Sequence, residues 1–484
     1  MVAFIFMFHL LLKVCIYQIQ RGENIQVISE QLKIILTFVV KGVSILLYIN
    51  KDTELTAGLL TKMIAYFTMN VQPKLKKYKE YYDGSQAILR KTYTDASKPN
   101  SRVVTNYCMN ITNSYCGYLA SPGFISYQSD NDIEQIMDVL RYNDYQAEDA
   151  DFLLDALIYG VACELMYSDT EGKTRFKLIN PTQCFGVYDD SLSDDLLYFV
   201  RIYKASEWDD NDIYYVDVYS DYDIKHYSMR GWNGQLELLG EEPHYFSQCP
   251  ANIFYLQDEK SIFDCIMGLQ DAVNETLSSE IDDYSAFCDA YLVLVGLDAD
   301  DEDIANMKQN RALVLPEGAS AQWLTKNPND TQVENILKRL HDSIYRIAQC
   351  PDFSSETFVG GVSSGIALMY RLVGMENRAG MIEGRMKKAL QRRIEVISGI
   401  ASLKMGEEVF RDIDIDFKRN IPEDVNNTIN LVNALKGTVS DATLLSQLPF
   451  ITDVNAELQA LKEQKAANME LYSFDIAEDD NNDN

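Results

Sequence analysis

A run of apolar side chains at helical spacing in the centre of the chain constrains the fold more than any other feature. Its members recur every three or four residues, which is the spacing of one face of an α-helix. They are Ile262, Ile266, Leu269, Val273, Leu277, Ile281, Tyr284 and Cys288. The pattern predicts one helix from about Asp258 to Ala290, roughly 50 Å long at ~1.5 Å per residue.

A compact module is expected after this helix. It comprises a strand, an acidic helix and two further strands: Tyr291–Gly296, Asp300–Gln309, Ala312–Leu315 and Gln322–Thr325. A second helix follows and ends before Pro351. Its apolar face is formed by Val333, Leu337, Leu340, Ile344 and Ile347. Two helices that bracket a small insertion predict a stalk with a head at its tip, and an ordinary helical hairpin with a βαββ insertion is the alternative.

A loop of glycine and serine with almost no charge joins the second helix to a third. Gly360, Gly361 and Gly365 permit backbone angles that other residues resist. Such a loop suits a surface that touches a partner without gripping it. A plain surface linker is the alternative.

The third helix, from Ile366 to about Leu403, concentrates basic residues in an otherwise acidic chain. The bases are Arg371, Arg378, Arg385, Lys387, Lys388, Arg392, Arg393 and Lys404, against Glu376, Glu383 and Glu395. They suit either a polyanion or an acidic neighbouring subunit. We favour the neighbour for most of them.

The overall charge limits the choice of partner. The 484 residues are 47% hydrophobic and carry a formal net charge of -30, so the chain can bury a core but is poorly suited to tight phosphate binding. Acids dominate the block from Asp130 to Lys225. We expect the beginning of this block, Ile133–Gly160, to be helical. The rest of that block predicts short strands at Phe176–Ile179, Leu196–Tyr203, Tyr214–Tyr219 and Lys225–Arg230.

Catalytic and metal chemistry find little support. The clustered carboxylates Asp209, Asp210 and Asp212 leave an acidic hydrolase open as an alternative, although acids in turns mostly cap and solvate. Nine cysteines without a CxxC pair predict free thiols, and four histidines without HExxH spacing give no zinc site. The run 298–303 lacks the calcium-loop glycine, because Asp303 stands at the sixth position and Gln309 at the twelfth. We expect no metal and no cofactor.

The first 50 residues differ in composition from the rest. They hold two acids, Glu23 and Glu30, and two apolar runs, Val2–Leu12 and Ile34–Ile49. A weak membrane segment, a packed helical extension and sequence translated upstream of the true start are the three options. We prefer the third, because the composition changes abruptly near Lys51.

Further elements flank the centre. Helical patterns cover Leu55–Lys91, with an interruption at Pro73, and Val103–Leu119. Val409–Phe417 alternates like a strand, and Glu423–Tyr472 forms a helical tail. The acidic end, residues 475–484, is expected to be disordered.

This order of parts resembles the portal proteins of tailed bacteriophages, in the branch of long-tailed phages. Tyr81-Tyr82-Asp83-Gly84 with Ile88 is similar to the family's YYxG signature, and the module within 291–326 to its clip between stem helices. Phe358 and the Ser364-Gly365-Ile366-Ala367-Leu368 run with Tyr370 resemble the tunnel loop and tunnel helix. The last strand and helices resemble the return through the wing into the crown. Gly361 and Met369 stand where family members often carry Asn and Lys.

The resemblance implies an elongated α+β fold with an α/β wing, a long helical stem, a small βαββ clip, a tunnel helix and a helical crown. The first 50 residues have no counterpart in it. The implied parts are wing 51–257, first stem helix 258–290, clip 291–328, second stem helix 329–351, tunnel loop 352–365, tunnel helix 366–404, wing return strand 405–421, crown 422–472 and acidic tail 473–484.

The function it implies is structural. The chain would form a ring, typically of twelve subunits, at one capsid vertex, through which double-stranded DNA is packaged and leaves. Implied partners are other copies of the chain, the terminase large subunit, the major capsid and scaffold proteins, and a head-completion or adaptor protein. Its location would be the virion, and the host cytoplasm during assembly. The alternatives are the acidic cytosolic hydrolase, a membrane-anchored protein and another minor head or adaptor protein of the virion.

The resemblance also nominates site residues. Thr357, Phe358, Val359, Gly360, Gly361, Val362, Ser363 and Ser364 would line the constriction of the channel. Arg371, Arg378, Arg385 and Lys388 are candidate contacts to a neighbouring subunit or to the DNA backbone. Asp300, Asp301, Glu302, Asp303 and Glu317 on the clip are candidates for docking the terminase or connector. No P-loop sequence GxxxxGK[ST] occurs, in agreement with an ATPase that is a separate chain.

Overall fold

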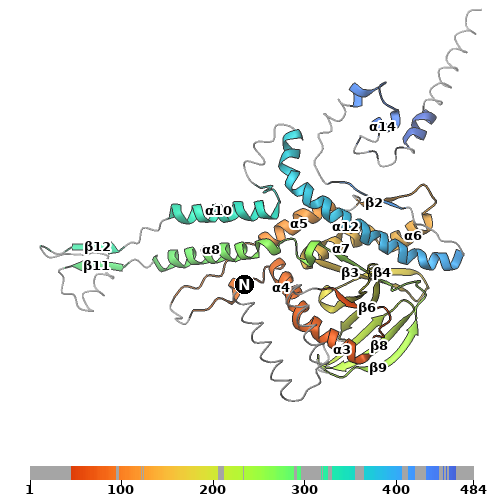
Figure 1. Ribbon diagram of the computed structural model, residues 1–484. Helices are drawn as coiled ribbons and strands as arrows, with labels where there is room; N and C mark the ends of the chain where they lie inside the picture. The colour runs from red at the N-terminus through yellow and green to blue at the C-terminus, as the bar shows by residue number, and fades with distance from the viewer. Residues whose placement is uncertain are drawn as a thin grey trace, which may run out of the picture. The chain divides into compact units, whose positions relative to one another are not determined.

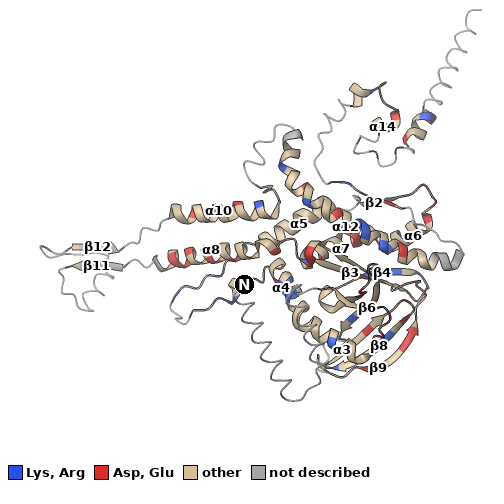
Figure 2. Cartoon of the chain, in the orientation of Figure 1, with Lys and Arg blue, Asp and Glu red and all other residues tan. Residues whose placement is uncertain are grey.

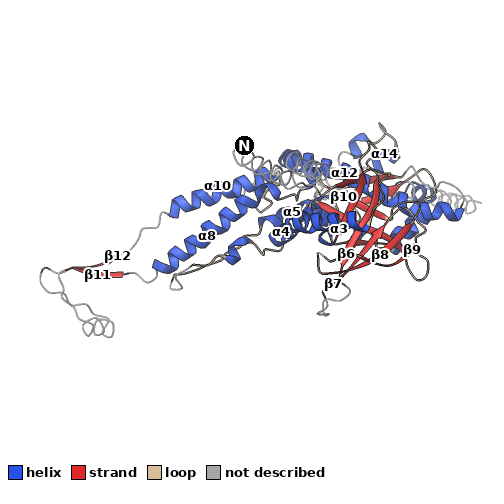
Figure 3. Ribbon diagram, turned by 60° about the horizontal axis from the view of Figure 1, so that its bottom comes forward, coloured by secondary structure: helices blue, strands red, loops and turns tan. Residues whose placement is uncertain are grey.

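The computed structural model divides into two units, each described here by itself. The first comprises Met1–Pro351 and Gly374–Lys418, and the second comprises Asp352–Val373 and Arg419–Asn484. The structure describes residues 45–93, 98–120, 123, 125–204, 212–232, 234–287, 291–295, 318, 320–324, 330–354, 365–405, 413–419, 432–445, 448, 451, 454 and 457–464. These residues form a mixed fold of helices and sheets, which confirms the expected α+β class (Figures 1 and 3).

Two helices and a π-helical turn begin the first unit. Thr56 caps α3 (Ala57–Tyr66) by accepting a hydrogen bond from the backbone N–H of Leu59, 3.3 Å away. The turn Phe67–Val71 leads into α4 (Gln72–Tyr82). Pro73 does not interrupt this segment as predicted, since it lies in the first turn of α4, where its missing N–H has no intrahelical partner to lose. The predicted stop is confirmed, because Gly84 adopts φ 80° just after α4 ends.

A six-stranded sheet forms the larger β element, with the order β1-β5-β6-β7-β8-β9. Its strands are β1 (Leu47–Ile49), β5 (Cys184–Asp189), β6 (Leu196–Tyr203), β7 (Ile213–Tyr219), β8 (Asp223–Arg230) and β9 (Glu237–Pro243). β1 pairs parallel with β5, and each later strand pairs antiparallel with the one before it. Residues 45–49 therefore belong to this sheet, with Ile45 and Ile49 buried, and not to a separate apolar extension.

The hydrophobic core lies on both faces of this sheet. On one face, Phe67 packs on Phe185 with ring centroids 5.1 Å apart, beside buried side chains of α3 and α4. The other face packs against a three-stranded antiparallel sheet of β10 (Ala251–Tyr255), β3 (Val161–Ser168) and β4 (Thr174–Ile179). Gly186 permits that approach, because a Cβ there would lie 2.6 Å from Ile253 Cδ1.

The remaining helices of the first half are α5 (Tyr107–Leu119), α6 (Glu134–Tyr142) and α7 (Tyr145–Tyr159). α7 ends at Gly160, which has φ 80°. A Cβ on Gly160 would lie 2.6 Å from the backbone of Lys260, so only glycine lets the later chain cross here. The backbone N–H groups of Leu256 and Ile262 donate to the carbonyls of Gly160 and Leu157 at this crossing.

The central helix pair is confirmed, with corrections. The first helix, α8, spans Met267–Phe287, and the second, α10, spans Asp330–Ala348; the two run side by side (Figure 1). The predicted start at Asp258 is wrong, because Asp258 and Glu259 adopt left-handed φ angles of 59° and 53°. Both lie in the segment 256–262 that crosses the end of α7, which we call the crossing segment. The predicted apolar stripe also fails towards its end, where Ile281 and Tyr284 are 42% and 73% exposed.

Other predicted elements are found in part. β11 (Tyr291–Val295) and β12 (Ser320–Leu324) form an antiparallel pair between α8 and α10 in chain order, and the acidic helix and the middle strand, Ala312–Leu315, predicted there lie outside the described residues. α12 (Gly365–Met405) is the long basic helix. β13 (Asp414–Phe417) pairs with β2 (Ile125–Gln128), with Ile415 buried and both aspartates exposed, as the alternation predicted.

The second unit is described less fully. It contains α14 (Asp441–Leu445) and short helical segments at 432–435 and 457–464, within the predicted helical tail. Most of that tail lies outside the described residues. Nowhere in the described part of the chain does a helix combine the length and apolarity that a membrane crossing needs.

One carboxyl group in the first unit titrates near neutral pH. Asp155 lies on α7, four residues after Asp151. Burial, with the nearby charge of Asp151, raises the pKa of Asp155 to about 6. Because the folded-state pKa exceeds the unfolded value of 3.8, this group lowers stability progressively as pH rises from about 4 through about 6.

We therefore expect Asp155→Asn to raise the melting temperature at pH 8 and to change it little at about pH 3.5, below the unfolded pKa. The gain at pH 8 should be about 2–3 kcal/mol, since the amide cannot ionise and each pKa unit is worth about 1.4 kcal/mol. Thermal unfolding across this pH range checks it. Asp151→Asn, which lowers the pKa of Asp155, should reduce the pH dependence without removing it. Parallel pH profiles for all three proteins would contradict the assignment.

Candidate functional site

The best-defined polar site lies where α4, α5, α8 and α10 meet the part of α12 that follows Gly374; we call it the helix junction. Its first component is an extended segment, residues 101–107, that runs antiparallel along α8. Four side chains of α8 accept hydrogen bonds from alternate backbone N–H groups of this segment. The pairs are Asp282 with Ser101 at 2.6 Å, Ser278 with Val103 at 3.0 Å, Asn274 with Thr105 at 3.0 Å and Gln270 with Tyr107 at 2.9 Å.

The register of these four bonds follows from backbone geometry. Four helical residues rise about 6 Å, and two residues of extended chain span about 6.6 Å, so every fourth helix position meets every second amide. All four side chains are buried. The contact face of α8 is thus a polar ladder, where the sequence predicted apolar packing.

Tyrosines of α4 hold the same helix and the turn just before it. The Tyr78 hydroxyl donates to Asp264 at 2.7 Å, and the Tyr81 hydroxyl donates to Asp271 at 2.7 Å. Burial and then the bonded carboxylate raise the pKa of both tyrosines. Tyr82 donates to Asn113 on α5 at 2.9 Å. The tyrosines of the Tyr81-Tyr82-Asp83-Gly84 sequence thus join α4 to α8 and to α5 by side-chain hydrogen bonds.

Arg378 of α12 holds the end of α10. Its two terminal nitrogens donate to the carbonyls of Ala348 at 2.9 Å and Ile262 at 2.7 Å. The Tyr115 hydroxyl also donates to the carbonyls of Ala348 and Gln349, each at 3.0 Å. A cation and a hydroxyl thereby satisfy the free carbonyls at the negative end of the helix dipole.

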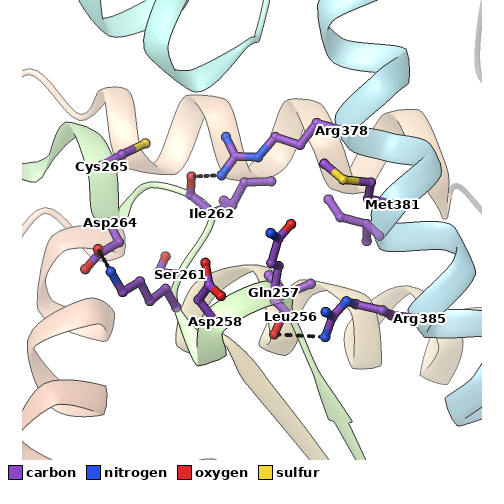
Figure 4. A pocket seen from close by; sticks show the side chains of 12 residues that line it. Leu256, Gln257, Asp258, Ser261, Ile262, Asp264, Cys265, Arg378, Met381 and Arg385 are labelled. Carbon is purple, nitrogen blue, oxygen red and sulfur yellow. Dashed lines mark hydrogen bonds and ion pairs between the residues drawn. The ribbon is translucent and has the colours of Figure 1, made fainter. Parts of the chain in front are cut away.

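A cavity of about 350 Å³ opens beside Arg378 (Figure 4). Arg378, Met381 and Arg385 of α12 form one wall, and the crossing segment with Asp258 forms another. Arg385 is exposed, and among the described residues it reaches the carbonyls of Tyr255 and Leu256, both at 3.5 Å. On the same segment as Asp258, Lys260 lies 3.7 Å from Asp264. The described lining offers charged groups but no nucleophile with a paired base.

A buried ionic cluster attaches α12 to the three-stranded sheet. Arg393 is fully buried; its Nε donates to Glu164 of β3 at 2.9 Å, and its Nη1 donates to Asp149 of α7. Although burial alone lowers the pKa of Arg393, Glu164 and Asp149 raise it well above the ordinary arginine value. Asn252 donates to Glu164 at 2.6 Å and Tyr127 to Asp149 at 2.8 Å.

The predicted site residues have different positions. Arg378 makes contacts within its own chain, whereas Arg385 and Lys388 lie on the exposed surface of α12. Arg371, also exposed, belongs to the second unit. The predicted tunnel loop, Thr357 to Ser364, and the predicted clip acids, Asp300 to Asp303 and Glu317, lie outside the described residues.

The enzyme alternative gains nothing from the structure. Asp209 and Asp210 lie outside the described residues, and Asp212 pairs with Lys204 at 3.4 Å. Among the residues that the structure describes, no three cysteine, histidine, aspartate or glutamate side chains gather as metal ligands.

The geometry thus defines an α+β protein whose helices are tied to a β core by directed polar contacts. Comparison with known proteins gives the family. The family model described as "Phage portal protein, SPP1 Gp6-like" matches residues 69–471, so the chain belongs to this family of phage portal proteins. The portal protein of Bacillus phage SPP1 is 24% identical over 417 residues, which cover 80% of each chain. The family is one of structural virion proteins, which supports the prediction that the chain is not an enzyme.

The polar ladder gives a first test of the junction. Asn274→Ala removes the acceptor for the Thr105 amide and hydroxyl, and leaves buried donors without partners. We expect a loss of about 2–4 kcal/mol in unfolding free energy and faster amide hydrogen exchange in residues 101–107. Ser279→Ala, next to the ladder on the exposed side of α8, is the matched control and should change neither. Equal effects of the two variants would count against the ladder.

The buried cluster gives a second test. Arg393→Met leaves two buried carboxylates without a cation and should cost about 3–5 kcal/mol in urea unfolding. Adding Asp149→Asn and Glu164→Gln to that variant should recover much of the loss, because the remaining groups are neutral. Lys388→Met, at an exposed base of the same helix, serves as the control. A triple variant no more stable than Arg393→Met would contradict this account.

Proposed function

We propose that the chain is one subunit of a ring of about a dozen copies at a capsid vertex, and that DNA passes through the channel of this ring. The parts follow the sequence assignment: residues 51–257 form the wing, α8 and α10 the stem, 291–328 the clip, α12 the tunnel helix and 422–472 the crown. Residues 45–49 are added to the wing, because β1 joins its sheet. The observation that carries the proposal is the portal family match over 69–471.

Charge supports passage of DNA over tight binding. α8 carries Asp271, Glu275, Glu280, Asp282 and Asp283 and no lysine or arginine (Figure 2). Attraction to many phosphates would hold DNA in place, and each neutralised phosphate adds to that affinity. We propose that the nearly neutral loop from Thr357 to Ser364 lines the constriction. The clip acids, Asp300 to Asp303 and Glu317, are proposed to dock the terminase or the head-tail connector.

Contacts between subunits are assigned to the exposed bases of α12. Arg385 and Lys388 keep their charges at the surface, whereas the guanidinium groups of Arg378 and Arg393 are used within the chain. A closed ring needs two different complementary surfaces on each subunit. We therefore propose that Arg385 and Lys388 face acidic side chains of the neighbouring subunit, with DNA phosphates as the alternative partner.

The mass of the purified full chain, with negative-stain images of the same fraction, tests the ring directly. Rings with a central hole are expected. A protein that stays monomeric or dimeric at all concentrations, with or without the capsid and scaffold proteins, would overturn the proposal.

Charge reversals separate assembly from folding. Arg385→Glu should lower ring yield several-fold with an unchanged melting temperature, because its side chain is exposed. Arg378→Glu should lower both, since a carboxylate would replace the cation at the carbonyls that end α10. Lys62→Glu on the exposed side of α3 is the control. If Arg385→Glu assembles like the wild type, the bases of α12 do not hold the ring together by charge.

A further inference from the structure

The strand β9 is an open edge of the six-stranded sheet. It pairs on one side with β8, and no described strand pairs with its other side. All of its residues, Glu237 to Pro243, are exposed. Leu238 and Leu239 are adjacent and are 56% and 58% exposed. An edge of this length with two bare leucines invites pairing with another chain.

Charge restricts which chain can pair there. Glu237, Glu241 and Glu242 give the strand three acids and no base. Lys225 lies opposite Glu241 in the register, and His226 Nε2 lies 3.6 Å from Glu242, so only part of this charge is offset within the sheet. Pairing with β9 of another copy would bring two strands with three glutamates each side by side, and repulsion between like charges destabilises such a pair.

The same strand contains features that limit pairing. Pro243 ends it and cannot donate a backbone hydrogen bond. The register with β8 shifts between His226 and Tyr227, which leaves Leu239 as an extra residue on β9. Charges, proline and bulges commonly prevent an open edge strand from pairing with other chains, whereas exposed leucines favour such pairing and add nothing to solubility. A partner that covers Leu238 and Leu239 would explain why these leucines are exposed in the isolated chain.

We propose that the β9 edge docks an extended, basic segment of another protein. The backbone of the segment pairs with residues 237–242, its lysines or arginines meet the glutamates, and its apolar side chains cover Leu238 and Leu239. Figure 2 shows the acidic colouring of β9. The β9 edge is a feature of a single subunit, so this proposal can be tested independently of ring formation.

The test uses the full chain and a short fluorescein-labelled peptide of alternating lysine and valine. We expect saturable binding by fluorescence anisotropy, and slower amide hydrogen exchange in residues 237–242 when peptide is bound. The double variant Leu238→Asn/Leu239→Asn, and separately Glu237→Gln/Glu241→Gln/Glu242→Gln, should each weaken binding about tenfold or more. Leu192→Asn, at a still more exposed leucine in the β5–β6 turn, should leave it unchanged.

Four results would overturn the proposal. Absence of saturable binding would do so, as would equal binding by the β9 variants and Leu192→Asn, which indicates attraction to the acidic surface in general. A peptide with N-methyl groups on alternate amides cannot pair as a strand, so equal affinity for it would exclude strand addition. Protection of 237–242 on self-assembly without peptide would identify the edge as a contact between copies.

Discussion

The arrangement of the helix junction depends on one constraint: the backbone amides of the extended segment 101–107 are buried against α8 and need acceptors. A neighbouring β-strand would supply backbone carbonyls as acceptors, but the backbone carbonyls along the side of a helix are already bonded within the helix. α8 supplies side-chain oxygens instead, at every fourth position. Such bonds are directional, so they fix both the rotation of α8 about its axis and its position along the segment. Apolar packing alone would fix these less sharply, because hydrophobic burial has no direction.

The other helices are tied to α8 by the same kind of contact. From α4, Tyr81 reaches α8 and Tyr78 reaches the turn just before it, and Arg378 links the segment before α8 to the end of α10. Farther along α12, the buried Arg393 binds a strand and a helix of the core at once. A buried ion pair adds little net stability but is costly to break. The effect of the Arg393 cluster is therefore to specify one position of this part of α12 on the β core.

The sequence predicted the elements whose pattern is periodic and whose ends are marked. β6 was predicted at its observed bounds, and the helix pair was predicted from its apolar spacing. β3 was missed because it is a nearly continuous apolar run directly after a helix, which periodicity cannot assign to either structure. β9 was missed because its residues favour neither core nor strand. The ladder was missed because Gln270, Asn274 and Ser278 have the composition of an exposed face, and only the tertiary fold reveals their partners.

The charges show the same limit. The acidic block and the basic helix suggested that opposite charges meet between subunits, yet Arg393 finds Asp149 and Glu164 in its own chain. Nothing in the sequence separates Arg393 from its half-buried neighbour Arg392. Folding thus uses part of the charge complementarity within the subunit. Because what remains for assembly is the charge that folding leaves at the surface, Arg385 and Lys388 stay candidates for contact with another molecule, while the contacts of Arg378 and Arg393 belong to the subunit itself.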